Sequence, residues 1–125
     1  MLQLTLDLHE HPILMQAKTS AQIANVDMHH SMVFGLIGGA WGWDEDATVL
    51  AFLQQMTTGL VSACQRLLPL GQRQASRIIW RLNVAIVAAA EHSRHADVRT
   101  VASFTPLPDM GAMRHPGLST RLFIS

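Results

Sequence analysis

The stretch DEDATVLAFLQQMTTGLVSACQRLLPLGQ, from Asp44 to Gln72, decides the fold of this chain. Its apolar residues recur at steps of three and four: Val49, Leu53, Met56, Leu60, Cys64 and Leu67. Polar residues collect on the opposite side: Gln54, Gln55, Thr58, Ser62, Gln65 and Arg66. This spacing is typical of an amphipathic helix with one buried face. Further apolar residues widen that face, so we interpret the stretch as the central helix of a bundle with neighbours on more than one flank.

Both ends of this helix carry recognisable signals. Asp44 is a good N-cap residue, and acidic Glu45 and Asp46 follow it at the positive end of the helix dipole. Pro69 lacks an N–H group and disfavours helical geometry at the preceding residue, and Gly71 permits a turn. The helix is therefore expected to end just before Pro69, where the chain reverses direction.

Three more helices are predicted around the central one. Pro12 opens a helix expected to run over residues 12–24, because Pro is favoured at a first helical position. Asn25 or Asp27 is expected to cap a second, largely buried helix ending near Gly39. A third helix is predicted from Gln72 to about Ser93, antiparallel to the central helix because the connection is short. Its predicted core positions are Ala75, Ile78, Ile79, Leu82, Ile86 and Ala89.

Glycines and chain ends complete the predicted architecture. Gly35, Gly38 and Gly39 indicate either the close approach of another helix or a loosely formed helix end. Leucines alternate with polar residues over residues 1–8, which predicts a strand. Residues 101–125 lose all periodicity and are expected to form a loop. The predicted fold class is all-α, an antiparallel helical bundle with an irregular C-terminal tail.

Composition limits the classes of function. A chain of 125 residues with 49% hydrophobic and 14% charged residues is expected to form one domain with a sizeable core. Nine basic and nine acidic residues cancel, which argues against recruitment by nucleic acid or an anionic membrane. A bundle this small cannot bury all of its apolar side chains, which indicates a partner chain.

Cysteine usage and targeting signals point to the cytoplasm. Cys64 is the single cysteine and lies on the apolar side of the central helix, so it is predicted to be a buried, inert thiol in a reducing compartment. No secretory signal is visible at the N-terminus. No uninterrupted apolar run reaches the roughly 18 residues of a membrane span, so no membrane insertion is expected.

Motifs for catalysis or metal binding are weak. Seven histidines include the pairs His9/His11, His29/His30 and His92/His95, but a closed zinc site needs further ligands, so capping or surface histidines are the favoured interpretation. Arg73, Arg77 and Arg81 recur at steps of four, where like charges either face solvent or meet an acidic partner. Nucleophile elbows, phosphate loops and zinc-protease motifs are missing, which predicts no catalytic residue, metal ligand or cofactor.

A set of ordered sequence blocks carries a family resemblance. LLPLGQ at 67–72 closes a long helix, and SFTPL at 103–107, MRH at 113–115 and RLFIS at 121–125 follow in order. Together with HSMVFGL at 30–36, they resemble the C-terminal half of the urease accessory protein UreF family. The resemblance covers about Asp27 to Ser125. The Leu-Pro-x-Gly-x-(Phe/Tyr)-Ser segment of the family's N-terminal half is absent, so a truncated product, a fragment or a short form is expected.

The resemblance implies a non-catalytic role in urease maturation. Members are helical dimers that bind the D-type or H-type urease accessory protein and dock the G-type GTPase, so that GTP hydrolysis is coupled to nickel insertion into apo-urease. On this basis the candidate partner-binding residues are Gln72, Arg77, Phe104, Pro106, Arg114, His115, Arg121, Leu122 and Phe123. Phe104, Leu122 and Phe123 suit ordering of the tail on a partner, because a buried Phe contributes roughly 1.5–3 kcal/mol.

The resemblance also divides the chain. Residues 1–26 match poorly, residues 27–96 form the helical core, and residues 97–125 form a partner-binding tail. Two other functions stay open. One is a direct nickel carrier that uses the histidines, and the other is a non-functional truncated remnant.

Overall fold

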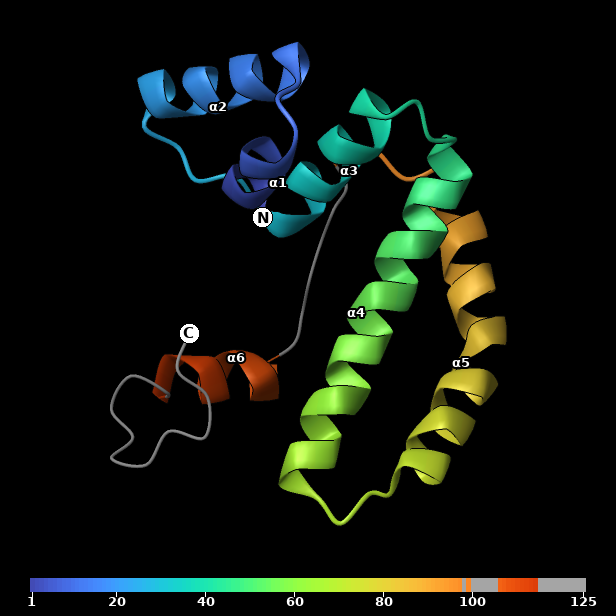
Figure 1. The fold of residues 1–125 in the computed structure, drawn as a ribbon. Helices are drawn as coiled ribbons and strands as arrows, with labels where there is room; N and C mark the ends of the chain where they lie inside the picture. Colours follow the sequence, from blue (N-terminus) through green and yellow to red (C-terminus); the bar gives the residue numbers. More distant parts are fainter. Residues whose placement is uncertain (98, 100–105, 115–125) are drawn as a thin grey trace. The chain divides into compact units, whose positions relative to one another are not determined.

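The computed structural model describes residues 1–97, 99 and 106–114, and it confirms the all-α fold (Figure 1). Its helices are α1 (Leu2–Leu8), α2 (Pro12–Ala24), α3 (His30–Ala40), α4 (Glu45–Leu67), α5 (Gln72–Ser93) and α6 (Pro106–Arg114). Contacts divide the chain into two units, Met1–His95 and Ala96–Ser125. Within the first unit, α1 packs on α2, α2 on α3, α3 on α4 and α4 on α5.

The hairpin of α4 and α5 forms as predicted. The side chain of Asp44 accepts a hydrogen bond from the backbone N–H of Ala47 at 3.2 Å, which caps the first turn of α4. Leu68 adopts an extended conformation before Pro69 and ends the helix. The side chain of Gln74 accepts from the backbone N–H of Gly71 at 3.2 Å, which satisfies a free donor where α5 begins. The two helices lie antiparallel and side by side (Figure 1).

The N-terminal segment is a helix, so the strand predicted for residues 1–8 is wrong. A lone strand leaves its backbone N–H and C=O groups unpaired, whereas a helix pairs them internally. The same leucines also satisfy helical spacing, and Leu6 is buried where α1 meets α2. Lys18 of α2 donates a hydrogen bond to the side chain of Gln3, which links the two helices at the surface.

The expected cap of α3 is also wrong. Asn25 instead ends α2 in a left-handed conformation with φ of 51°, a geometry that Asn tolerates better than most residues. The Nδ1 atom of His29 caps α3 by accepting from the backbone N–H of Ser31 at 3.4 Å. Gly38 is buried, and a Cβ atom built there would lie 2.7 Å from Thr48 of α4. Close helix approach is therefore the reason for one of the three α3 glycines.

The helix α6 differs from the loop expected over residues 101–125. Pro106 and Pro108 fall in the first turn of α6, where backbone N–H groups have no helical partner and proline is tolerated. Ahead of α6 in the same unit, Arg99 forms an ion pair with Asp97 at 2.6 Å. This hydrogen-bonded guanidinium lowers the pKa of Asp97. Residues 100–105 and 115–125 lie outside the described part of the chain.

The predicted buried face of α4 is wrong for its C-terminal half. We define the α4 seam as Val49, Leu53, Met56, Leu60 and Leu67. Val49 and Leu53 are half-buried, but Met56, Leu60 and Leu67 are 44%, 65% and 53% exposed. The residues of α4 that instead face α5 by helical spacing are more polar: Leu50, Gln54, Thr57, Val61 and Gln65. The α4 seam therefore has no cover among the described residues along most of its length.

The predicted core residues of α5 are likewise only partly buried. Ala75 and Ile86 are buried and Ile79 is half-buried, in line with their predicted contact with α4. Ile78 and Leu82 are 37% and 38% exposed, although they were predicted to lie in the core. Ala89 is also exposed, whereas its neighbour Ala90 is buried. The predicted core of α5 therefore extends beyond the sector that α4 covers.

Mean hydropathy and length would allow one described helix, α4, to cross a membrane. The prediction of no membrane span rests on uninterrupted apolar runs, and the polar residues within α4 interrupt any such run without lowering its mean hydropathy enough to exclude a span. These properties are shared by interior helices of bundles, and Gln54 and Gln65 on the α5 side are unfavourable in lipid. The polar stripe of α4 therefore favours packing within a helical protein.

The single cysteine is exposed, so the prediction of a buried thiol is wrong. Cys64 lies beside Leu60 and Leu67 by helical spacing, and no neighbour covers this sector among the described residues. We expect Cys64 in the folded chain to react with Ellman's reagent at a rate within about threefold of that in guanidinium chloride, because access limits thiol reactivity. Reaction only after denaturation would contradict the exposed position.

Candidate partner-binding surfaces

An exposed ion pair holds one end of the α4–α5 hairpin together. Arg94 donates two hydrogen bonds to Asp46, from Nε at 2.7 Å and from the guanidinium at 2.5 Å. This bidentate pair joins the C-terminal end of α5 to the first turn of α4. Hydrogen bonding to Asp46 and its negative charge raise the pKa of Arg94. The pair therefore links the end of α5 to α4 beside the surface described next.

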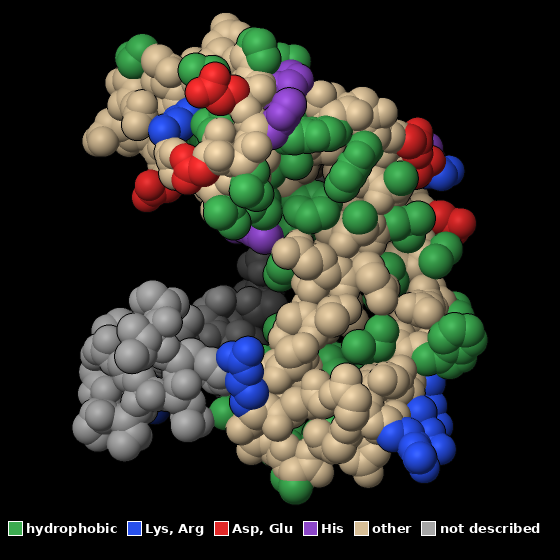
Figure 2. All heavy atoms as spheres, viewed as in Figure 1, with side chains coloured by type: hydrophobic (Ala, Val, Ile, Leu, Met, Phe, Trp, Pro, Cys, Tyr) green, Lys and Arg blue, Asp and Glu red, His purple; other side chains and the backbone are tan. Residues whose placement is uncertain are grey.

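An apolar groove of about 330 Å³ lies where α3, α4 and the end of α5 meet. It is lined by Ser31, Phe34 and Gly35 of α3, Thr48, Val49, Phe52 and Leu53 of α4, and Ala89 and Ser93 of α5. The rings of Phe34 and Phe52 meet edge to face at 5.5 Å, and His30 lies 5.7 Å from Phe52. Figure 2 shows hydrophobic side chains gathered over α3 and the adjoining end of α4. The groove is continuous along the helix with the exposed part of the α4 seam.

A second surface lies on the opposite side of α5 from the groove. We define the α5 outer face as Arg73, Arg77, Trp80, Arg81, Val84 and Val87, which share one side of the helix by their spacing. Trp80 and Val84 are 77% and 79% exposed. The three arginines are exposed and form no ion pair within the described part of the chain. Figure 2 shows Lys and Arg side chains gathered over the N-terminal end of α5.

Two of the predicted site residues belong to the first unit. Gln72 begins α5 and accepts a hydrogen bond from the side-chain amide of Gln65 at 2.9 Å, so it joins the two arms of the hairpin at its turn. Arg77 lies five residues further on and belongs to the α5 outer face. The three arginines noted in the sequence thus lie on this face, and the role of Arg77 in partner binding stays a prediction. The sequence prediction did not include three apolar residues of this face, although their helical spacing places them opposite the core positions of α5: Trp80, Val84 and Val87.

The other predicted site residues belong to the second unit or lie outside the described residues. Pro106 begins α6 and Arg114 ends it, and both are exposed. Phe104, His115, Arg121, Leu122 and Phe123 fall outside the described part of the chain. Their assignment as partner-binding residues therefore stays a prediction.

Two of the three histidine pairs, His9/His11 and His29/His30, serve the fold in the first unit. The rings of His9 and His11 lie 5.7 and 5.9 Å from that of Trp41, so both contact the corner after α3. The Nδ1 atom of His11 is buried there without a hydrogen-bond partner. His29 caps α3, and His30 joins the phenylalanine cluster at the groove. In the described residues, no group of three or more His, Cys, Asp or Glu side chains is arranged to hold a metal ion.

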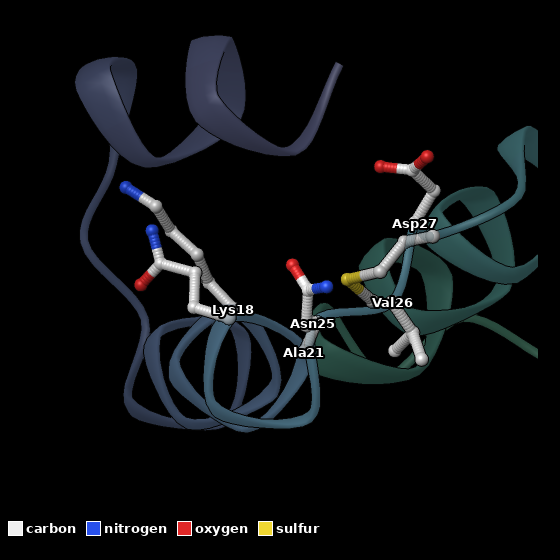
Figure 3. Close-up of a pocket in the computed structure, with 7 residues that line it drawn as sticks. Lys18, Ala21, Asn25, Val26 and Asp27 are labelled. Carbon is white, nitrogen blue, oxygen red and sulfur yellow. The ribbon is translucent and has the colours of Figure 1, made fainter.

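A hollow lies between α2 and the start of α3. It measures about 500 Å³, and its lining includes Lys18, Asn25 and Asp27 (Figure 3). Figure 3 shows Lys18 and Asn25 extending from α2 into this space. Its lining contains no Ser, Thr, Cys or His, so a Ser–His or Cys–His nucleophile and base are not assembled there. The apolar groove and the α5 outer face are therefore better candidates for function than this hollow.

Comparison with known proteins decides the family. A family model described as UreF matches residues 1–83, which is more than half of the chain. The chain belongs to the UreF family. The family match begins at residue 1, whereas the sequence blocks had placed the start of the UreF resemblance near Asp27. No solved structure matches the chain.

Curated UreF relatives support this membership. The urease accessory protein UreF of Rhodopseudomonas palustris (strain BisB5) is 34% identical over 96 residues, which are 77% of this chain and 40% of the relative. The UreF of Trichodesmium erythraeum (strain IMS101) is 34% identical over 99 residues, 79% of this chain and 43% of the relative. The UreF of Actinobacillus pleuropneumoniae serotype 3 (strain JL03) is 26% identical over all 125 residues and 55% of the relative. The chain thus spans about half the length of these UreF relatives.

Proposed function

We propose that this chain is a non-catalytic scaffold of urease maturation. In this role it binds the D-type or H-type urease accessory protein and the G-type GTPase, and it helps to couple GTP hydrolysis to nickel insertion into apo-urease. Membership of the UreF family supports a role as a urease accessory protein. The apolar groove and the exposed Trp80 and Val84 of the α5 outer face support a role exercised through protein contacts.

The α5 outer face is the observation that carries the proposal for the GTPase. Three arginines, for which the described residues provide no ion-pair partner, accompany exposed Trp80 and Val84, which is the composition of a binding patch with an aromatic anchor and a basic rim. Like charges at helical spacing repel one another by a few tenths of a kcal/mol, about 0.2–0.5 per pair, and an acidic partner relieves this repulsion. We therefore assign Arg77 to contact with an acidic surface of the GTPase.

The tail is proposed to bind the D-type accessory protein. Phe104, Leu122 and Phe123 would supply apolar anchors, with Arg121 fixing the register. Gln72, Pro106, Arg114 and His115 complete the proposed contact set. Homodimer formation and cytoplasmic location stay predictions. Direct nickel carriage is not proposed, because His9, His11, His29 and His30 are engaged in ring contacts or helix capping.

Charge reversal at Arg77 tests the proposed GTPase contact. With the purified G-type GTPase, added with the D-type protein, we expect Arg77→Glu to raise the Kd about tenfold or more and to reduce its dependence on salt. Titration by isothermal calorimetry at two salt concentrations measures both effects. The matched control is Gln55→Glu, which adds a negative charge at an exposed position on the side of α4 away from α5.

The outcomes of this titration separate the possibilities clearly. Equal weakening by both variants would indicate a general charge effect and contradict a contact at the α5 outer face. Unchanged binding by Arg77→Glu would remove this face from the proposed function. A failure of the D-type accessory protein to bind the unmodified chain would contradict the scaffold role itself.

A further inference from the structure

Charge is distributed unevenly along the hairpin of α4 and α5, although it cancels over the whole chain. From residue 47 to residue 90 the sequence contains no Asp, Glu or Lys and four arginines: Arg66, Arg73, Arg77 and Arg81. All of these arginines are exposed and lie in the half of the hairpin nearer its turn. Acidic residues lie at the opposite end: Asp44, Glu45, Asp46 and Glu91. The hairpin therefore has a basic end at its turn, where Figure 2 shows Lys and Arg side chains.

The turn at this basic end is apolar. We define the hairpin tip as Leu67, Leu68, Pro69 and Leu70. Leu67 and Leu68 are 53% and 59% exposed, and Pro69 is exposed beside them. The backbone N–H of Leu70 donates to the carbonyl of Leu68 at 2.7 Å, and the side chains of Gln65 and Gln72 are hydrogen-bonded across the base of the turn. The hairpin tip is thus an ordered aliphatic protrusion at the end of two helices (Figure 1).

Shape and composition favour a lipid surface over an acidic protein as the partner of the hairpin tip. The tip is convex and purely aliphatic, whereas the cores of protein interfaces are enriched in aromatic side chains. Arg66 and Arg73 flank it, and arginine side chains can lie along apolar groups while their guanidinium groups reach phosphate. Apolar residues at the end of a structure and basic residues just behind them are typical of attachment to anionic membranes.

We propose that the hairpin tip attaches this chain to the surface of an anionic lipid membrane. Leu67 and Leu68 enter the boundary between headgroups and acyl chains, to a depth of about 5–10 Å. Arg66 and Arg73 then lie at the level of the lipid phosphates, and the rest of the hairpin stays outside the membrane. The attachment is reversible, because it combines a short apolar tip with a few charges. This inference goes beyond the scaffold role and requires neither urease nor the GTPase.

Co-sedimentation of the full chain with lipid vesicles tests the inference. The probes are vesicles of equal parts phosphatidylcholine and phosphatidylserine, and vesicles of phosphatidylcholine alone. We expect binding to the mixed vesicles at low salt, binding to phosphatidylcholine that is weaker by about tenfold or more, and release from the mixed vesicles as salt is raised. These results would establish that the membrane charge drives the attachment.

Cys64 reports whether the hairpin tip enters the lipid. It is exposed, is the single cysteine of the chain, and lies one helical turn before Leu67. A dye whose emission depends on polarity can therefore be attached at this one position. We expect the emission of the dye to shift to the blue when the mixed vesicles are added, because the surroundings of the tip become less polar.

Matched variants locate the contact. Leu68→Asp is expected to weaken binding to the mixed vesicles about tenfold or more, since it replaces an inserted apolar side chain by a negative charge. Leu4→Asp, at a leucine of α1 that is 63% exposed, is expected to bind like the unmodified chain. Arg73→Gln is expected to weaken binding about fivefold, and Lys18→Gln, which removes a positive charge from α2, by much less. Circular dichroism checks that the helical content of the free variants is equal.

Four results would overturn the inference. These are no binding to the mixed vesicles, equal binding to phosphatidylcholine alone, equal weakening by Leu68→Asp and Leu4→Asp, and binding without a shift in the emission of the dye at Cys64. If vesicles do not bind and Leu68→Asp weakens binding of the purified GTPase, the hairpin tip belongs to an acidic protein instead. Loss of GTPase binding in Arg77→Glu is measured without lipid, so the proposed function is tested separately.

Discussion

Leu14→Ala is expected to destabilise the chain by about 2–5 kcal/mol, the usual cost of truncating a fully buried leucine. Among the described residues, Leu14 is the large side chain with no exposed surface, and it lies on α2, which packs against both α1 and α3. Few side chains of the first unit are buried, so the loss is a large fraction of a total that is commonly 5–15 kcal/mol. In the Leu14→Ala variant, we expect α1 and α2 to unfold at a lower temperature than the hairpin of α4 and α5.

Thermal unfolding followed by circular dichroism measures this effect. The matched control is Ile13→Ala, which removes a similar volume from the preceding position of α2, where the side chain is 53% exposed. The control is expected to change stability by about 0.5 kcal/mol or less, as is usual at the surface. Equal effects of the two substitutions would contradict the packing of α2 against its neighbours.

Gly38→Ala is expected to lower stability by about 1–2 kcal/mol, even though alanine favours helices by about 1 kcal/mol over glycine. A Cβ atom at this position would lie 2.7 Å from both Oγ1 and Cγ2 of Thr48. Thr48 is buried, and its hydroxyl donates to the carbonyl of Asp44 at 2.9 Å, so rotation of the side chain would break that hydrogen bond. The helices α3 and α4 must therefore move apart to accommodate the methyl group.

Gly39→Ala, one residue further along α3, is the control, and its expected effect on stability is opposite to that of Gly38→Ala. No atom lies within 4 Å of a Cβ atom built at Gly39, so this variant is expected to raise stability by up to about 1 kcal/mol. Urea unfolding of both variants measures the difference. Stabilisation by Gly38→Ala would show that α3 does not approach α4 at Thr48, and the α3 wall of the groove would then be misplaced.

The α3–α4 contact matters for function because it shapes the groove. Phe34 and Gly35 form the groove wall one turn before Gly38, and Val49 follows Thr48 on its floor. A variant that separates the two helices would widen the groove without changing its lining residues.

The candidate site was only partly predictable. Arg77 was found because identical charges at steps of four are visible in the sequence, whereas Trp80 and Val84 of the same face resemble ordinary helix residues until their exposure is known. The tail residues Arg121 and Phe123 came from family resemblance alone, and they lie outside the described residues. The α4 seam was recognised as apolar, but it was assigned to the chain's own core.

Local signals were sufficient to define α2, α4 and α5. Pro12 at a first helical turn, Asp44 as an N-cap and Pro69 after a helix end all act within a few residues, on backbone groups that must be paired wherever the chain goes. Local signals cannot decide the secondary structure when one sequence pattern suits both a strand and a helix. The leucines at residues 1–8 suit both a strand and a helix, and contact with α2 favours the helix.

Amino-acid pattern established that α4 has an apolar face, but the arrangement of α3 and α5 determined which part of that face is covered. Helical periodicity indicates that an apolar stripe is buried. The same periodicity is expected whichever neighbouring segment buries that stripe. Which side chains of the stripe are buried depends on which other helices pack against α4. The described helices cover the side of Val61 and leave Leu60 open.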